Sequence, residues 1–361
     1  MNIYVLGEDL QIIGVVNKYS ALQWVDTWSK EGSFQLWAPL NDENSSLLVR
    51  GNLIWIEEDT LGVIQRVVRE LDEEGERTIS VSGKFVECWI QKRIIWGKFV
   101  SNNSFVTDVM RSLVYNQCIN PTDSRRKLPY IALSDNQSSL GPQISITRSY
   151  SNVWDECVSL SQTYDLHPRL RFNRKNRSLV FSVVTGSDKS SLVTIDSDLG
   201  EILKSSYTED MSNLKTTALI AGQGEDEDRV TTDVGNEKSG LERAELYVDA
   251  RDLSKTNSEG SVLTGEEYIA MLQQRGTSKL SDNPVYVDYL CSINTDNQKG
   301  HIYGVDYSLG DVVSLQDKLL KIRLSAKVVE RARYWDQGGL TTDLTVGIAI
   351  PTISDMIKKG V

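Results

Sequence analysis

The chain has 361 residues, of which 40% are hydrophobic and 25% are charged, and its formal net charge is −11. This length allows two or three domains with sizeable cores, and the composition is that of a globular protein rather than a disordered or fibrous one. The negative charge argues against general nucleic-acid binding, which needs clustered Lys and Arg. Acidic residues near Met1 do not fit a signal peptide, and no apolar run is long enough to predict a membrane-spanning helix. We therefore expect a soluble protein that is not secreted through a signal peptide.

Cysteine and histidine are too few and too scattered to predict a catalytic or metal centre. His167 and His301 are the only histidines, and neither lies in a metal-ligand spacing or beside a nucleophile motif. The four cysteines form no CxxC pair, so we expect buried free thiols; they are Cys88, Cys118, Cys157 and Cys291. The sequence thus predicts a protein that is not an enzyme, with no catalytic residue, no metal and no cofactor.

The first hundred residues have the alternating pattern of half-buried strands. Between Gly51 and Gly83, apolar segments separated by short turns predict a three-strand antiparallel meander. Six tryptophans in this part indicate a core, a subunit interface or both, because large aromatic side chains dominate the energetics of each. They are Trp24, Trp28, Trp37, Trp55, Trp89 and Trp96.

The middle of the chain changes to a mixed pattern. Helical spacing of apolar residues predicts helices at about 105–117, after the capping candidates Asn103 and Ser104, and at about 152–164, behind Ser151. A polar loop lies between the two helices, and a β-hairpin follows the second, with its turn near 173–177. These elements predict an α+β insertion at 98–200.

The next part begins with a predicted strand from Thr216 to Gly222, followed by an acidic loop. Consecutive carboxylates make a phosphate-binding loop very unfavourable, and the spacing of an EF-hand is missing, so we expect a solvated loop. The four acidic residues are Glu225, Asp226, Glu227 and Asp228. A capping box at 264–267 predicts a short helix through about 275.

The end of the chain repeats the meander. Apolar segments from Gly310 to Gly347 have the same order as those from Gly51 to Gly83, which suggests duplicated β domains, although any two antiparallel meanders look alike. We expect Gly51 to match Gly310 and Gly83 to match Gly347, each at a turn or a close backbone approach. The predicted domains are 1–97, 98–200 and 201–361. The predicted fold class is α+β, mainly antiparallel β.

The order of these elements resembles the siphophage tail-hub family. This family includes the amino-terminal domain of tail-associated lysins and shares its fold with the central baseplate hub of contractile-tailed phages. The resemblance covers nearly the whole chain and depends on the order and spacing of several segments rather than on one motif. These segments are 62–66, 81–83, 179–186, 216–229, 245–250 and 307–313.

The resemblance implies a homotrimer in which each chain supplies two tube-like β-barrel domains to a pseudo-sixfold ring, with 98–200 at the periphery. Such a hub caps or continues the tail tube, converts sixfold to threefold symmetry and forms part of the DNA ejection channel, where the acids at 225–228 could face the lumen. The implied partners are the distal tail protein ring, the carboxy-terminus of the tape measure protein and receptor-binding or tip fibre proteins. DNA would pass through transiently without specific binding. The implied location is the distal end of the tail in a virion assembled in the bacterial cytoplasm.

Three alternatives stay open at this point. The chain could be the amino-terminal part of a cell-wall-degrading tail lysin, although the residues up to Val361 leave no room for a lytic domain unless the chain is a fragment. It could be a receptor- or glycan-binding protein of the tail tip, with the tryptophan-rich segment supplying stacking faces. It could also be the hub of a contractile particle or tailocin.

Overall fold

The computed structural model describes the chain except for residues 72–74, 226–227, 236, 257–261, 284–285, 294–299, 319 and 348–361. The described chain folds into two compact units. The larger unit combines Met1–Ser206 with Tyr289–Gly347, and the smaller unit is Tyr207–Asp288.

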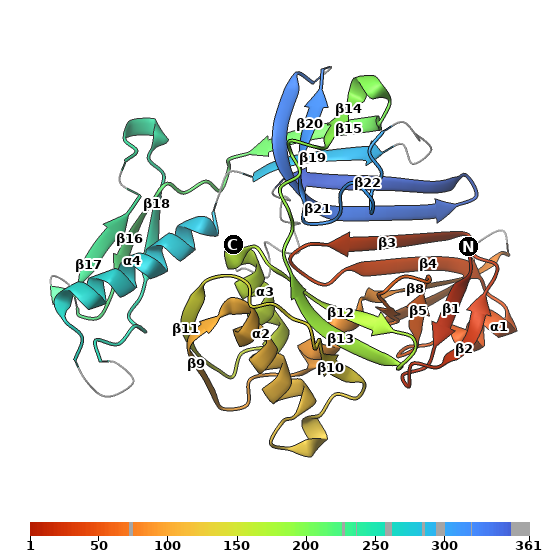
Figure 1. The fold of residues 1–361 in the computed structure, drawn as a ribbon, viewed down its shortest axis with the longest axis horizontal. Coiled ribbons are helices and arrows are strands. Elements are labelled where there is room, and N and C mark those ends of the chain that lie inside the picture. The colour runs from red at the N-terminus through yellow and green to blue at the C-terminus, as the bar shows by residue number, and fades with distance from the viewer. Residues whose placement is uncertain are drawn as a thin grey trace. The chain divides into compact units, whose positions relative to one another are not determined.

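A ten-stranded sheet built from both ends of the sequence dominates the larger unit (Figure 1). Two of its strands lie off the main path: β14 (Thr194–Asp196) pairs in parallel with β20 (Val312–Asp317), and β20 pairs with β21. The main path reads β15 (Ile202–Asp210), β19 (Tyr286–Ile293), β22 (Gly339–Gly347), β21 (Ile322–Asp336), β3 (Ala21–Thr27), β4 (Ser33–Pro39), β8 (Arg77–Lys84) and β7 (Arg66–Leu71).

The main path consists of two halves with one strand order. We call β3, β4, β8 and β7 the first half, and β15, β19, β22 and β21 the second half. When the four strands of a half are numbered by their order in the chain, both halves read first, second, fourth, third across the sheet from β15 to β7. The halves are joined where β21 of the second half pairs antiparallel with β3 of the first half.

Backbone hydrogen bonds align the two expected meanders residue by residue. In the first, Gly51 N donates to Ile64 O at 2.9 Å, and Ile64 N donates to the carbonyl of the residue after Gly51 at 2.9 Å. In the second, Gly310 N donates to Val328 O at 2.8 Å, and Val328 N donates to the carbonyl of the residue after Gly310 at 2.9 Å. Gly51 and Gly310 therefore occupy equivalent places in the two meanders.

The expected match of Gly83 with Gly347 is wrong by one residue. In the first half Ser82 pairs with Arg66, and in the second half Thr345 pairs with Glu330, the residue equivalent to Arg66. This register aligns Gly83 with Val346. The alignment is set by the hydrogen bonds between strands and not by the position of the glycine in the third strand. Whether the whole predicted domains 1–97 and 201–361 superpose stays a prediction.

A second sheet packs on the first half. Its order is β2-β1-β5-β6, and the middle strand of the first meander bends from this sheet, as β6, into the large sheet, as β7. The two sheets enclose a core that includes Trp24, Phe34 and Leu36. The elements of this layer are β1 (Ile3–Leu6), β2 (Ile12–Val16), α1 (Asp42–Leu47), β5 (Leu53–Trp55) and β6 (Gly62–Val63).

The insertion contains the two expected helices and the expected hairpin. Asn152, rather than Ser151, caps the second helix by accepting from Trp154 N at 2.9 Å. The first helix has no side-chain cap, since strand β9 runs up to its first turn. The short helix η1 (Val86–Lys92) precedes the insertion. The elements of the insertion are β9 (Lys98–Phe105), α2 (Val106–Val114), its π-helical continuation η2 (Tyr115–Ile119), η3 (Ser124–Arg126), β10 (Ile131–Leu133), β11 (Gln143–Ser149), α3 (Val153–Tyr164), β12 (His167–Asn173), β13 (Ser178–Val184) and η4 (Ser197–Leu199).

The smaller unit packs one helix on a three-stranded sheet of order β17-β16-β18. The capping box is confirmed: Thr264 Oγ1 accepts from Glu267 N, and the Glu267 carboxylate accepts from Thr264 N. The helix continues beyond the predicted end near 275. The elements are β16 (Thr217–Ala221), β17 (Thr231–Val234), η6 (Gly240–Glu242), β18 (Glu245–Asp249) and α4 (Gly265–Ser281).

The prediction of a mainly antiparallel β fold with few helices is confirmed. The described strands form open sheets and no closed barrel. An open sheet keeps its end strands unpaired, so the edges of the large sheet are available to pair with another strand.

Candidate assembly interface

The junction between the two halves shows how one half joins another. Strands β21 and β3 pair antiparallel from Glu330 opposite Thr27 to Trp335 opposite Leu22. The last strand of one half thereby lies against the first strand of the other, a head-to-tail arrangement. A head-to-tail contact can be repeated by further copies, and it closes into a ring when the rotation allows.

Paired charges hold this junction together, with Arg333 buried and its partners partly buried. Arg331 donates to Asp26 at 2.8 Å, and Arg333 donates to both Asp26 and Glu58 at 3.1 and 2.8 Å. Burial acts to raise the pKa of Glu58, but the hydrogen bond and charge of Arg333 outweigh it, so this pKa lies below its usual value. The Arg331 guanidinium also lies 4.4 Å from the centre of the Tyr303 ring. The junction is therefore an ion-pair network that would be costly to break on one side only.

Trp28 links the junction to the insertion and to the second meander. Its indole N–H donates to Asp165 at 3.1 Å, and its ring stacks on His167 with 4.9 Å between centroids. Gly310 lies so close that a Cβ there would come within 2.0 Å of the indole ring. Since Gly310 also has φ +91°, both the backbone and the neighbouring ring require glycine.

Glu87 is a second buried polar group beside the insertion. Its Oε1 accepts from the backbone N–H of Leu170 at 2.8 Å, while Oε2 is buried without a hydrogen-bond partner in the described chain. Burial raises its pKa to about 7. Burial, with the positive charge of Arg169, lowers the pKa of His167 to about 3, so this histidine stays neutral. Neither group faces a described pocket, and we assign them to structure rather than to chemistry.

The two ends of the large sheet are free edges. Strand β7 pairs with β8, strand β15 pairs with β19, and neither pairs with a further strand among the described residues. Each edge also exposes a leucine: Leu71 is 65% exposed on β7 and Leu203 is 66% exposed on β15. Unpaired edges with exposed apolar side chains readily pair with another strand. These edges are the strongest candidate sites for assembly.

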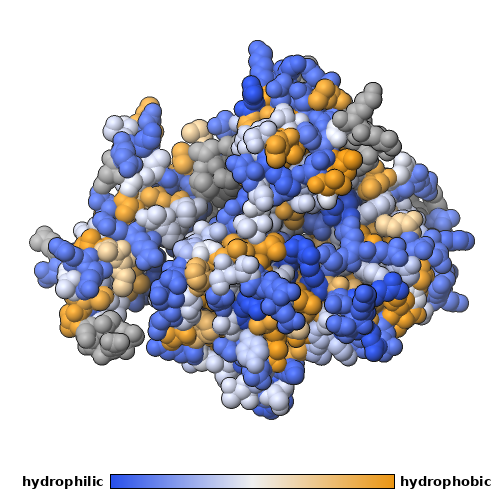
Figure 2. Space-filling model, viewed as in Figure 1, coloured by the Kyte–Doolittle hydropathy of each residue, from blue (hydrophilic) through white to orange (hydrophobic). Residues whose placement is uncertain are grey.

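The surface view agrees with association through edges. On the face shown in Figure 2, apolar residues form separate small groups among polar ones rather than one broad apolar area. Main-chain hydrogen bonding along a strand edge does not require a broad apolar face.

The predicted acidic loop is only partly described. Glu225 and Asp228 are exposed, whereas Asp226 and Glu227 lie outside the described residues. The loop belongs to the smaller unit, where Arg229 beside it donates to Asp249 at 2.8 Å. Its lumenal position stays a prediction.

The four glycines singled out from the sequence have distinct settings. Gly51, Gly310 and Gly347 have φ of +93°, +91° and +119°. Gly83 has no such angle, but a Cβ there would lie 1.8 Å from the carbonyl oxygen of Val63. Their role in specifying tube-like domains stays a prediction.

The described residues give little support for a reactive thiol, a metal site or a membrane-spanning helix. All four cysteines are free and buried, and burial raises the pKa of Cys88 to about 12. Among the described residues no group of three or more His, Cys, Asp or Glu side chains is placed to hold a metal. None of the described helices is both long and apolar enough to cross a bilayer.

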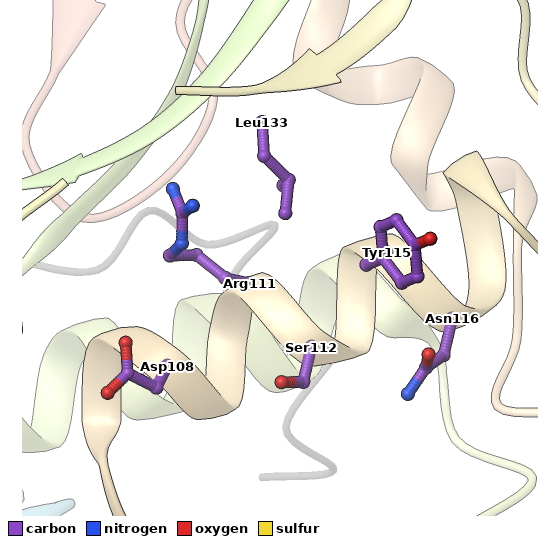
Figure 3. Close-up of a pocket in the computed structure, with 6 residues that line it drawn as sticks. All are labelled: Asp108, Arg111, Ser112, Tyr115, Asn116 and Leu133. Atoms are coloured by element: carbon purple, nitrogen blue, oxygen red, sulfur yellow. The ribbon is translucent and has the colours of Figure 1, made fainter. Parts of the chain in front are cut away.

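One shallow pocket of about 200 Å³ lies along α2. Asp108, Arg111 and Ser112 of α2 line it with Tyr115 and Asn116 of the π-helical turn, and Leu133 of β10 lies across from them (Figure 3). Its charged groups each have one partner: Arg111 donates through Nη2 to Ser134 O at 3.0 Å, and Asp108 accepts from Ser139 Oγ at 2.9 Å. The Nη1 of Arg111 is buried without a hydrogen-bond partner in the described chain. The pocket has neither the enclosure nor the paired acid and base of an active site.

Comparison with known proteins identifies the family. A sequence model of the Siphovirus ReqiPepy6 Gp37-like protein family matches residues 2–348. The chain belongs to this family. The resemblance to siphophage tail proteins is thereby confirmed. No curated protein matches the chain.

Solved structures of phage tail proteins share the fold of this Gp37-like chain. A tail protein from Neisseria meningitidis is 15% identical with a TM-score of 0.60, and the match covers 96% of each chain. The 43 kDa tail protein of prophage MuSo2 from Shewanella oneidensis is 13% identical with a TM-score of 0.60, over 96% of this chain and 98% of that one. Prophage tail protein gp18 from Listeria monocytogenes is 14% identical with a TM-score of 0.51, over 100% and 98%. The chain thus has a phage tail-protein fold along nearly its whole length.

The junction and the edges were not predicted from the sequence. The strands that form the junction lie some 300 positions apart in the chain, and no local pattern reports such a pairing. One signal was present: Arg331 and Arg333 alternate on a strand otherwise rich in apolar residues, which is unusual for a buried position.

Proposed function

We propose that this chain is a structural hub protein of the phage tail tip, in which three copies form a ring of six similar β halves. The observation that carries the proposal is the pair of halves with one strand order, joined head to tail by β21 and β3 and ending in the unpaired edges β7 and β15. Repeating the junction between copies pairs β7 of one chain with β15 of the next. Three chains then give six halves around one axis.

The ring would supply the closed barrel that the described strands of one chain do not form. In this proposal residues 1–97 and 201–361 contribute the tube-like domains, and residues 98–200 lie at the periphery. A ring of six similar halves matches a sixfold tail tube, while its three chains present threefold symmetry to the tip. Its neighbours would be the distal tail protein ring, the carboxy-terminus of the tape measure protein, and receptor-binding or tip fibre proteins.

The hub forms part of the channel through which DNA leaves the particle. Each copy adds a net charge of −11, and negative charge at the channel wall repels phosphate over a Debye length of about 8 Å. We place the acids 225–228 at this wall or at a subunit contact. DNA would then slide without specific binding, and the protein acts as a structural component rather than an enzyme.

A receptor- or glycan-binding role is the second candidate, because the α2 pocket combines the partly exposed ring of Tyr115 with polar side chains. Tyrosine faces with neighbouring hydroxyl and amide groups suit hydroxylated ligands. Glycan binding by the isolated protein, lost in Tyr115→Ala, would favour this role.

Mass measurement and imaging of the purified protein test the hub proposal. Light scattering should give three times the 40.5 kDa of one chain, and negative-stain images should show rings with an axial opening. Leu71→Lys at the β7 edge should weaken the trimer about tenfold, because a charged edge disfavours strand addition. The control Leu192→Lys changes a leucine that is 77% exposed and lies off this edge. A strict monomer at high concentration, or six copies per ring in virions, would contradict the proposal.

A further inference from the structure

Cationic residues lie close to Trp96 in the sequence of this otherwise acidic chain, and Arg126 lies close to it in the fold. Trp96 is 71% exposed and follows η1, and Ile94 beside it is 40% exposed. Five cationic residues close to it in the fold or in the sequence define, with Trp96, what we call the Trp96 surface. They are Lys92, Arg93, Lys98, Arg126 and Lys127.

Hydrogen bonds to backbone and amide groups hold this surface in place. The Arg126 guanidinium lies 5.1 Å from the centre of the Trp96 ring and donates to Ile94 O at 2.6 Å and to Gln117 Oε1 at 3.0 Å. Arg93 in turn donates to Arg126 O, and Trp96 N donates to Gln117 Oε1 at 3.1 Å. The tryptophan and the two arginines are therefore ordered in the free chain, which lowers the entropy cost of binding a partner.

The five cations of this surface form no ion pair with a carboxylate of the described chain. Asp123, three and four residues before Arg126 and Lys127, pairs with Arg125 at 2.8 Å. Trp and Arg are the residues most enriched where binding energy concentrates in interfaces. An ordered Trp–Arg stack with unpaired cations around it fits a partner that is acidic.

The chain itself contains an acidic unit of the required kind. Residues 207–288 hold eight Lys and Arg against seventeen Asp and Glu, a net charge of −9 out of −11 for the whole chain. Strand β15 leads directly into this unit, since it runs from Ile202 to Asp210. Strand β15, which would pair with β7 of the next copy, is thus continuous with the acidic unit. In the sequence, η1 and the Trp96 surface follow β8, the strand that pairs with β7.

We infer that the Trp96 surface binds the acidic unit of the neighbouring copy. This inference rests on the proposed trimer and adds a second contact to it, outside the paired strand edges. Charge attraction would guide the copies into the head-to-tail orientation, and the Trp96 ring would be buried on contact.

Zero-length crosslinking of mixed-isotope protein tests this contact. Light and heavy copies are unfolded together, refolded and treated with a carbodiimide, which joins lysine amines to carboxylates in contact. We expect crosslinks from Lys92, Lys98 or Lys127 to acids of 207–288 that combine one light and one heavy peptide. If every such crosslink joined two light peptides or two heavy peptides, the lysines would contact the acidic unit of their own chain. That result would overturn the inference.

Charge-reversal variants give an independent measurement. The triple variant Lys92→Glu, Lys98→Glu, Lys127→Glu should raise the trimer dissociation constant 10- to 100-fold at low salt and flatten its dependence on salt. The matched control reverses three exposed cations elsewhere, Lys18, Lys175 and Arg177, and should change the constant by less than about threefold.

The outcomes separate this inference from the hub proposal. A trimer whose stability is equal in the triple variant and its control, and which yields no such crosslinks, would contradict the contact and leave the hub intact. A chain that stays monomeric under all conditions would overturn both.

Discussion

The two halves of the large sheet share a strand order but are stabilised in different ways. The first half is covered by a second sheet, and its core is apolar, with Trp24 and Leu36 fully buried. Among the described residues, the second half packs against the short β14–β20 pair and the segment that contains Tyr303 and Tyr307. It also buries a polar group: Asp317 accepts from Tyr289 at 2.9 Å and from Ser205 at 2.6 Å. Backbone hydrogen bonding thus preserves the topology, whereas the layer that packs on it is free to differ.

The largest difference in the free energy of unfolding is expected from replacing the two equivalent glycines, Gly51 and Gly310. Gly310→Ala should lower the free energy of unfolding by about 3–5 kcal/mol, since the new Cβ meets the rigid Trp28 ring and the backbone angle is also unfavourable. Gly51→Ala should cost only about 1 kcal/mol, because its Cβ meets the mobile end of Glu8. Urea denaturation measures both. Equal losses would show that Trp28 does not fix the second half.

The next largest loss of stability is expected from replacing an arginine of the junction between β21 and β3. Arg333→Met should cost about 2–3 kcal/mol in the dilute protein, because the partly buried carboxylates of Asp26 and Glu58 lose one guanidinium. Arg69 occupies the equivalent position on the free edge β7, where it is exposed, so Arg69→Met should change the stability of the dilute protein by less than about 0.5 kcal/mol. Thermal unfolding of the pair of variants checks this. A loss at Arg69 as large as that at Arg333 would contradict the equivalence of junction and edge.

A smaller effect depends on pH and concerns the layer next to the first half. Burial raises the pKa of Glu87 from its usual value to about 7, so the folded state holds a proton more tightly than the unfolded state. This contribution to stability is complete below about pH 4.5 and is lost as the pH rises through 7. Glu87→Gln, which resembles the protonated acid, should therefore gain about 1–3 kcal/mol over the natural chain at pH 8 and little at pH 4.5. Denaturation midpoints at the two pH values measure the gain. A variant that is equally destabilised at both would refute the assignment.

Local patterns predicted much of the fold. The helices expected at 105–117 and 152–164 are confirmed, as are the hairpin after them and the capping box at Thr264, because each depends on periodicity or capping within a short segment. The glycine match was correct at Gly51 and Gly310 and wrong by one residue at Gly83. Register between strands depends on hydrogen bonding that a glycine in one strand does not report.

The candidate interface was far less visible in the sequence. The Asp26–Arg331 pair joins residues from opposite ends of the chain, and the contact of Trp28 with Gly310 depends on the same long-range pairing. The tryptophan-rich first segment and the resemblance to tail-hub proteins suggested assembly, but neither indicated which strands take part. The free edges β7 and β15 became candidates once the pairing of β21 with β3 was known.

A high-resolution electron microscopy map of the assembled ring would show directly which strands pair between copies. We expect three copies, with β7 of each copy hydrogen-bonded antiparallel to β15 of the next, as β21 pairs with β3 within the chain. Six halves would then surround one axis, with the helices α2 and α3 away from it. A ring of six copies, or three copies whose β7 and β15 edges are unpaired, would contradict the account.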